Sequence, residues 1–158
     1  MPAREFLSQE EEQLIVEAIN RAEEGTTGEI RVHIEFRCKK DPLERAETLF
    51  HELNMDQTER RNGTLLYIAV KDRKVAIYGD AGISSQVDDR FWQEEIDKLI
   101  GYFKEDKFEA GIENVVGDIG EKLKQFYPGE TANPNELQND ISFKDNRNEK
   151  SEGKTDET

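Results

Sequence analysis

The chain has 158 residues, a formal net charge of −14, 37% charged residues and 34% hydrophobic residues, which suffices for about one domain with one hydrophobic core. The negative charge argues against nucleic acid and anionic membrane surfaces as partners and favours cations and basic proteins. Cys38 is the only cysteine and no apolar stretch matches a signal peptide or a membrane span, so we expect a cytoplasmic protein without an internal disulfide or a membrane anchor.

The first part of the chain is predicted to fold as a helix, a strand and a second helix. Ser8 and Glu11 form a capping box at the start of the first helix, and Gly25 follows its end. Apolar and polar residues alternate over residues 29–36. This pattern predicts a strand with one polar face, less deeply buried than the strand that follows it. The second helix is expected to cover residues 42–53.

The middle of the chain is predicted to form a hairpin followed by two helices. Residues 63–70 are an almost uninterrupted apolar run, typical of a central strand, and a basic turn joins them to a strand at residues 74–79. A loop over residues 81–89 leads into a helix that starts near Asp89. Its apolar stripe consists of Trp92, Ile96, Leu99, Ile100 and Phe103. The last helix covers residues 108–126 and contains three glycines, which indicate close approach to a neighbouring element: Gly111, Gly117 and Gly120.

The end of the chain differs in composition from the rest. Residues 1–128 are predicted to form the globular domain, whereas residues 129–158 are rich in polar and acidic residues and poor in apolar ones. Such a segment buries too little apolar area to offset its chain entropy, so we expect it to be mostly disordered. Residues 135–143 are the part of this tail that is expected to dock on the domain, because they carry Leu137, Ile141 and Phe143.

This order of elements predicts a three-layer α/β/α sandwich with a small mixed sheet of three to four strands. The crossover helix makes the first two strands parallel, and the hairpin makes the third antiparallel to the second. The start of the first strand, the start of the second and the end of the third then lie at one end of the sheet. Glu29, Asn62 and Asp80 are therefore expected to converge there, with Asp88 and Asp89 close by at the end of the loop.

Four of these acidic residues are candidate ligands for a divalent cation. Carboxylates and loop carbonyls are hard oxygen ligands that suit Ca²⁺ best, with Mg²⁺ or Mn²⁺ as alternatives. The predicted ligands are Glu29, Asp80, Asp88 and Asp89. A purely structural interpretation stays open for each of them. Asp88 or Asp89 is a natural N-cap of the following helix, and Asp80 is a natural turn residue. Glu29 has Arg61 and Arg31 as possible ion-pair partners.

A family resemblance rests on the hairpin and on three further segments. Asn62-Gly63, an apolar strand, a basic turn, a second strand and Gly79-Asp80-x-Gly82-Ile83 follow one another, and residues 27–32 (TGEIRV) precede them. Residues 135–137 and 140–143 complete the set. Together these segments resemble the TPM domain in its small soluble bacterial form. The family includes calcium-binding members, which favours the cation site, and its members are often described as acid phosphatases.

Three functions therefore remain open for the chain. The first is a metal-stabilised binding module that uses the acidic loops. The second is a weak metal-dependent phosphomonoesterase at the same site, acting on a phosphorylated small molecule, with Arg61 and Asn62 as phosphate or structural contacts. A thiol mechanism is excluded by spacing, because the arginine after Cys38 that it requires lies seven positions on, at Arg45. The third is an acidic adaptor for a basic protein. No catalytic residue is assigned.

Overall fold

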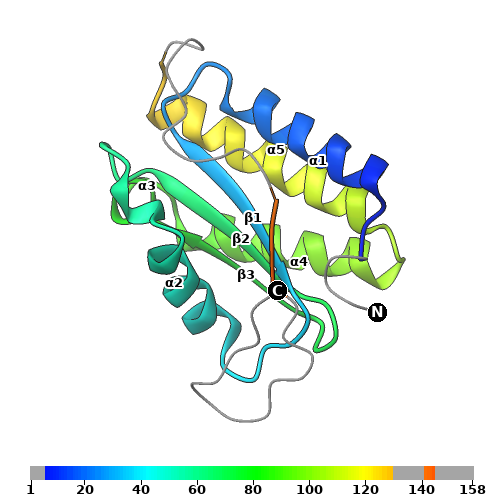
Figure 1. Cartoon of the computed structure of the whole chain (residues 1–158). Helices are drawn as coiled ribbons and strands as arrows, with labels where there is room; N and C mark the ends of the chain where they lie inside the picture. The colour runs from blue at the N-terminus through cyan, green and yellow to red at the C-terminus, as the bar shows by residue number, and fades with distance from the viewer. Residues whose placement is uncertain (1–5, 130–140, 145–158) are drawn as a thin grey trace.

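The computed structural model describes residues 6–129 and 141–144, and a four-stranded mixed sheet forms its centre (Figure 1). The strands lie in the order β3, β2, β1, β4. Their bounds are β1 Glu29–Glu35, β2 Gly63–Ala69, β3 Lys74–Gly79 and β4 Ile141–Lys144. β1 is parallel to both β2 and β4, whereas β3 is antiparallel to β2. The predicted directions of the first three strands are confirmed.

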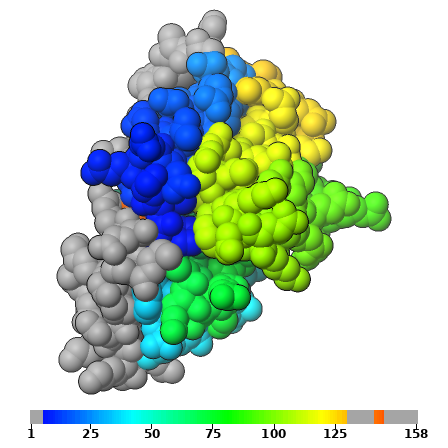
Figure 2. Space-filling view, turned by 90° about the vertical axis from the view of Figure 1, so that its right-hand side faces the viewer, coloured from blue at the N-terminus to red at the C-terminus, as the bar shows by residue number. Residues whose placement is uncertain are grey.

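Three helices pack on one face of the sheet. They are α1 (Gln9–Glu23), α4 (Asp89–Lys104) and α5 (Phe108–Phe126). Residues of β1 and β2 that point to this side, such as Val32 and Leu66, belong to the same apolar core as the inner faces of these helices. Figure 2 shows α1 and α5 side by side on the surface of this layer. The burial of one apolar stripe per helix is what fixes the layer to the sheet.

The opposite face of the sheet is covered by helix α2 (Pro42–Glu52) and the short 3-10 helix η2 (Met55–Gln57). A second apolar core lies between them and the sheet. Its buried members are Cys38, Ala46, Leu49, Phe50, Met55, Leu65, Tyr67, Ala69 and Ala76. The molecule is therefore a three-layer α/β/α sandwich, as the sequence predicts (Figure 1).

The helix boundaries follow from local signals in the sequence. Ser8 Oγ accepts from the N–H of Glu11 and the Glu11 carboxylate accepts from the N–H of Ser8, so the predicted capping box opens α1. Gly25 follows the end of that helix with a φ of +83°, a conformation that glycine adopts without strain. Asp41 caps α2, whose first residue is Pro42, a residue favoured at that position because its missing N–H is not needed there.

Four predictions about the elements need correction. β1 ends at Glu35, and it is buried on both faces instead of exposing a polar one. The predicted loop over residues 81–89 contains a short helix, α3 (Ala81–Ser84). Ile100 lies on the outside of α4, where 38% of its surface is exposed. Gly117 has open space beside it, so the expected close contacts are made by Gly111 against Tyr102 and by Gly120 against Ala22.

The tail contributes one described element, strand β4. Ile141 is buried and joins the core beneath α1 and α5, and Phe143 packs against it. These are two of the three side chains through which docking of the tail is expected, and the third, Leu137, lies outside the described residues. The predicted disorder of the remaining tail also concerns residues that the structure does not describe. Among the described helices, none combines the length and the apolar character needed to cross a membrane.

Candidate functional site

The strand register brings Glu29, Gly63 and Asp80 into one row across the end of the sheet. Glu29 pairs with Gly63 in the parallel ladder, and the Asp80 N–H donates to the Gly63 carbonyl at 2.9 Å. Side chains that lie opposite one another across strands point to the same face, so Glu29 and Asp80 share the face that α2 covers. The Met55 carbonyl lies over this row, 3.2 Å from where a Gly63 Cβ would be. The expected convergence of these strand ends is confirmed.

Asp80 holds the end of β3 to α3 and to the loop before β2. Its carboxylate accepts from the Ala81 N–H at 2.7 Å and caps α3, as the structural interpretation of this residue expects. The other carboxylate oxygen lies 3.0 Å from Arg61 Nε. This bond and the charge of Asp80 raise the pKa of Arg61. The Asp80 side chain is 4% exposed and that of Arg61 is 54% exposed, so the arginine lies over the carboxylate from the solvent side.

Glu29 and Asn62 are also buried at the same end of the sheet. Glu29 is 4% exposed. Asn62 Nδ2 donates to Thr27 Oγ1 at 3.1 Å, which ties the start of β2 to the segment before β1. The Asn62 Oδ1 atom is buried, and within the described residues no donor reaches it. Of the two predicted phosphate or structural contacts, Arg61 faces the solvent side and Asn62 is buried inside.

Asp88 and Asp89 lie at the start of α4, the helix that covers the other face of the sheet from α2. Asp88 accepts from the Arg90 N–H at 3.0 Å, so it is the N-cap that one interpretation of the sequence expects. Asp89 is exposed in the first turn of α4, which favours an acidic residue there. Within residues 6–129 and 141–144, no three acidic, histidine or cysteine side chains are grouped so that they could hold a metal ion. The four-carboxylate cation site therefore stays a prediction.

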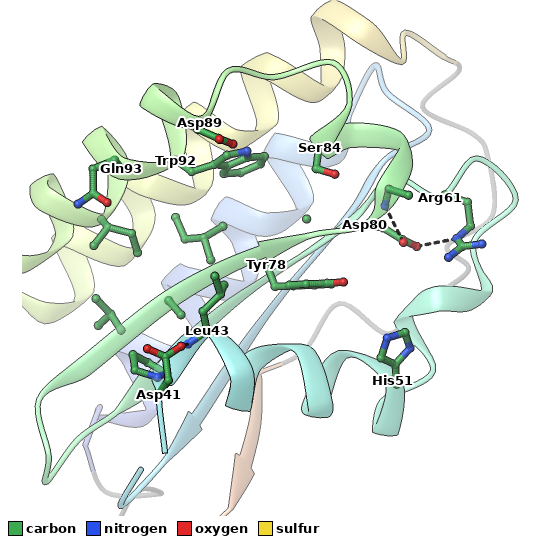
Figure 3. A pocket seen from close by; sticks show the side chains of 17 residues that line it. Asp41, Leu43, His51, Arg61, Tyr78, Asp80, Ser84, Asp89, Trp92 and Gln93 are labelled. Carbon is green, nitrogen blue, oxygen red and sulfur yellow. Dashed lines mark hydrogen bonds and ion pairs between the residues drawn. The ribbon is translucent and has the colours of Figure 1, made fainter. Parts of the chain in front are cut away.

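A groove of about 830 Å³ runs along the outer edge of β3 (Figure 3). β3 forms its floor from Val75 to Gly79, with α2 on one side and α4 on the other. Tyr78 lies in its centre, Asp80 and Arg61 lie at one end, and Asp41 marks the other end in Figure 3. Asp89 and Trp92 belong to the α4 wall. The groove therefore has an apolar floor with carboxylates at both ends.

The family of the chain follows from comparison with known proteins. The model of the TPM domain family matches residues 3–122, most of the chain. The chain belongs to the TPM domain family. This confirms the resemblance that the hairpin and its flanking segments show. Among curated proteins, no match was found.

Solved structures share the fold of this TPM domain. The NMR structure of the BA42 protein from the psychrophilic bacterium Bizionia argentinensis is 41% identical, with a TM-score of 0.80 over 87% of this chain and 95% of that one. An N-terminal domain from P. gingivalis has 17% identity and a TM-score of 0.65, covering 76% of this chain and 78% of that one. The N-terminal domain of cg2496 from Corynebacterium glutamicum has 12% identity and a TM-score of 0.59, covering 84% and 80%. The last two likenesses show the fold alone.

A buried polar cluster on the α2 side of this TPM domain is not indicated by the sequence pattern. Glu35 is fully buried and accepts two hydrogen bonds of 2.9 Å from Arg45 and a third from the Tyr67 hydroxyl. His33 Nε2 lies 3.3 Å from the same carboxylate. Burial alone would raise the pKa of Glu35, but the bonds from Arg45 and His33 outweigh it and lower the pKa to about 2. Burial also lowers the pKa of His33.

This cluster contains the residue types of a hydrolase triad, but it is not arranged for hydrolysis. His33 Nδ1 shares a hydrogen bond of 2.7 Å with Ser142 Oγ, so serine, histidine and glutamate form a chain. The carboxylate at its end is already occupied by Arg45 and Tyr67, and none of the cluster lines the groove. The chain of bonds instead fastens β4 to β1 and β1 to α2. The polar cluster therefore contributes to the stability of the domain.

Proposed function

We propose that this TPM domain is a binding module that takes up a divalent cation, Ca²⁺ foremost, at the sheet end marked by Glu29 and Asp80. The observation that carries the proposal is the row of buried oxygens at that end. Two nearly buried carboxylates flank Gly63, with the Met55 carbonyl over it and the Asn62 amide oxygen nearby. Calcium binds carboxylate, amide and carbonyl oxygens in flexible geometry, so this donor set suits it.

The ion pair between Arg61 and Asp80 competes with the binding of a metal ion at Asp80. Arg61 Nε lies 3.0 Å from an Asp80 carboxylate oxygen, so the guanidinium balances the charge of Asp80 when no metal ion is bound. A metal ion therefore has to displace Arg61 in order to bind Asp80. Arg61 is more than half exposed, so its side chain is free to move into solvent at small cost. Asp89 lines the same groove as Asp80 and supplies a further carboxylate, whereas Asp88 stays at the helix cap. The proposed ligands are thus Asp80 and Glu29 first, with Asp89 as a further one, whereas Asp88, the fourth predicted ligand, caps α4 beside them.

Calorimetric titration with calcium chloride tests the cation site. Asp80→Asn keeps the side-chain shape and is expected to weaken binding by about tenfold, because affinity depends on the charge of the ligands. Arg61→Ala removes the competing cation and is expected to tighten binding. Asp106→Asn is the matched control, since it removes the same charge from an exposed position outside the groove. Equal weakening by Asp80→Asn and Asp106→Asn would show diffuse attraction to an acidic surface and contradict the proposal.

A second candidate is a metal-dependent phosphomonoesterase at the same end of the groove. It is favoured by one observation, the position of Arg61 beside Asp80 on the groove wall, where a guanidinium is able to contact a phosphate oxygen. Cys38 takes no part in this candidate, because its thiol is buried and donates to the Lys40 carbonyl at 3.2 Å. Phosphate release from p-nitrophenyl phosphate, measured with calcium, magnesium or a chelator, tests it. Activity that survives chelation but disappears in Cys38→Ser would contradict it.

The third candidate is an acidic adaptor for a basic protein. The net charge of −14 supports it, because such a charge attracts basic partners over long range. A cytoplasmic location is part of all three proposals and is supported by the single, reduced cysteine. Pull-down of the domain on a lysine-rich peptide at low and high salt separates long-range attraction from a specific site, because only the former vanishes at high salt.

A further inference from the structure

Strand β3 presents a free backbone edge to the groove. In the described sheet it pairs with β2 alone. Hydrogen-bonded pairs alternate along an antiparallel ladder, and the bond from the Asp80 N–H to Gly63 fixes the phase. The N–H and C=O groups of Val75, Ile77 and Gly79 therefore point away from β2. None of the backbone hydrogen bonds found outside the sheet in the described part of the chain involves these three residues.

The walls of the groove leave this edge accessible and shape it for one more strand. α2 and α4 cover opposite faces of the sheet, and the groove runs between them along the length of β3 (Figure 3). Leu43 stands on the α2 wall with 50% of its surface exposed, and Trp92 and Ile96 belong to the α4 wall. An exposed apolar side chain next to unpaired backbone groups is characteristic of a binding edge.

We propose that the groove binds an extended peptide segment of a partner protein, which adds to β3 as a fifth strand. Backbone hydrogen bonds to Val75, Ile77 and Gly79 would hold the peptide, and its side chains would point alternately to the two walls. One set faces Leu43 and Tyr78, and the other faces Trp92 and Ile96. This inference goes beyond the proposed cation site, because the contacts with β3 need no cation.

The chemistry of the groove selects the peptide. Its floor from Val75 to Gly79 matches about five extended residues, at about 3.4 Å per residue. Both walls offer apolar surface there, so the centre of the peptide is apolar. Two exposed carboxylates line the groove, Asp41 at one end and Asp89 on the α4 wall, whereas Asp80 at the other end is paired with Arg61. The whole chain carries a charge of −14. The occupant is therefore a short apolar strand flanked by lysine or arginine.

Two other occupants fit these features less well. The chain's own segment after β4 follows the opposite edge strand of the sheet, and residues 145–158 contain no apolar side chain to match the floor. A second copy of the domain would bring another −14 charge and a second set of helix walls to the same edge. A basic peptide from a different protein meets neither objection.

NMR titration of the full chain in the presence of a chelator tests the proposal. The probe is a nine-residue synthetic peptide with two lysines at each end and alternating valine and isoleucine between them. We expect amide shifts along β3 and slower hydrogen exchange at Val75, Ile77 and Gly79. The same peptide methylated on alternate backbone nitrogens is expected not to bind, because it cannot complete the ladder. Shifts spread over the acidic surface, or equal binding of the methylated peptide, would overturn the proposal.

A matched pair of variants locates the binding surface. Leu43→Lys replaces an apolar side chain on the groove wall by a positively charged one, which repels a basic peptide. We expect it to weaken peptide binding by about tenfold. Leu14→Lys makes the same change at an exposed leucine of α1, outside the groove, and is expected to change binding by less than about twofold. Equal effects of the two would overturn the groove assignment.

Self-association at β3, seen as concentration-dependent shifts without peptide, would overturn the choice of occupant in favour of a second copy. Because the chelator removes calcium throughout, loss of the cation site leaves this result unchanged.

Discussion

At the scale of single residues, the Glu35 side chain is fully buried and is held by several polar partners. A fully buried carboxylate is costly unless charges and hydrogen-bond donors surround it, and here Arg45, Tyr67 and His33 all do so. The planar guanidinium of Arg45 binds both carboxylate oxygens, a geometry that lysine cannot reproduce. The cluster therefore links β1, β2 and α2 through one charge.

Glu35→Gln is expected to lower the free energy of unfolding by about 3 to 5 kcal/mol, because it leaves the Arg45 charge without its partner in a mostly buried site. Urea unfolding at pH 7 measures the change. Glu47→Gln on the exposed side of α2 is the control and is expected to change stability by less than about 0.5 kcal/mol. A loss below about 1 kcal/mol in Glu35→Gln would mean that water replaces the carboxylate around Arg45.

Glu95 makes the stability of the domain depend on pH. Burial, with the hydrogen bond to Asp118, raises the pKa of Glu95 to about 7 from an ordinary 4.5. The folded domain then holds a proton between these values that the unfolded chain has released, so the free energy of unfolding falls as pH rises through this window. Glu95→Gln is expected to flatten that slope and to stabilise the domain by about 1 kcal/mol at pH 8. Urea unfolding at pH 5 and pH 8 checks this, with the exposed Glu94→Gln as control; an unchanged slope would contradict it.

The residue roles that the sequence indicates correctly are the local ones. Asp80 and Asp88 precede helices, and their capping bonds reach one and two residues along the chain. The partners of Glu35 lie 10 residues away at Arg45 and 32 away at Tyr67, and only the fold brings them together. Alternation in β1 therefore predicts a polar, solvent-facing set of residues where the structure has a buried cluster. The positions of the four predicted ligands also depend on the fold, because Glu29 and Asp80 lie in one row across the sheet whereas Asp88 and Asp89 lie at the start of α4.

At the scale of elements, the contact between α1 and α5 depends on one glycine. A Cβ on Gly120 would lie 2.6 Å from Ala22 Cβ and 2.9 Å from the Ala22 backbone, which leaves no room for it. A Cβ on Gly117 in the same helix would meet no atom within 4 Å. Sequence alone marks all three glycines of α5 equally, because the spacing to a neighbouring helix is a property of the packing.

Gly120→Ala is expected to lower the free energy of unfolding by about 1 to 3 kcal/mol, since α1 and α5 have to separate to admit the methyl group. Gly117→Ala is its matched control and is expected to raise stability by about 1 kcal/mol, because alanine is the better helix former and meets nothing. Urea unfolding of both variants measures the difference. Stabilisation by both would show that the two helices shift apart without cost.

The sequence predicts the bounds of an element best where its apolar residues recur regularly over many positions. α5 is predicted at its observed bounds because its apolar residues recur over 19 residues. α3 has four residues, too few for a period, and it falls within a predicted loop. β4 is also four residues long, and its register with β1 is set by contacts about 110 residues apart, such as the one between His33 and Ser142. Its two apolar side chains indicate docking, but no local pattern gives the strand or its partner.

At the scale of the whole molecule, the two edges of the sheet differ. β4 covers the outer side of β1, whereas the described structure has no strand beyond β3. Without β4, the N–H and C=O groups on one side of β1 would face the solvent, and Ile141 would leave the core beneath α1 and α5. The two parts of the tail therefore contribute differently to the domain. Ile141–Lys144 completes the sheet, whereas residues 145–158 contribute charge and no apolar area.

Two truncations test this division. A chain that ends after Lys144 is expected to keep its melting temperature within about 2 °C, because the residues it loses carry no apolar side chain to bury. A chain that ends after Gly129 is expected to melt at least about 5 °C lower, because it loses the burial of Ile141 and the four-residue ladder with β1. Ser142→Ala in the full chain removes the side-chain bonds to His33 and to the Val32 carbonyl but keeps β4, and its melting temperature is expected to fall between those of the two truncated chains. Calorimetry of the three proteins separates the contributions, and a large drop on ending the chain after Lys144 would show that the final residues pack against the domain.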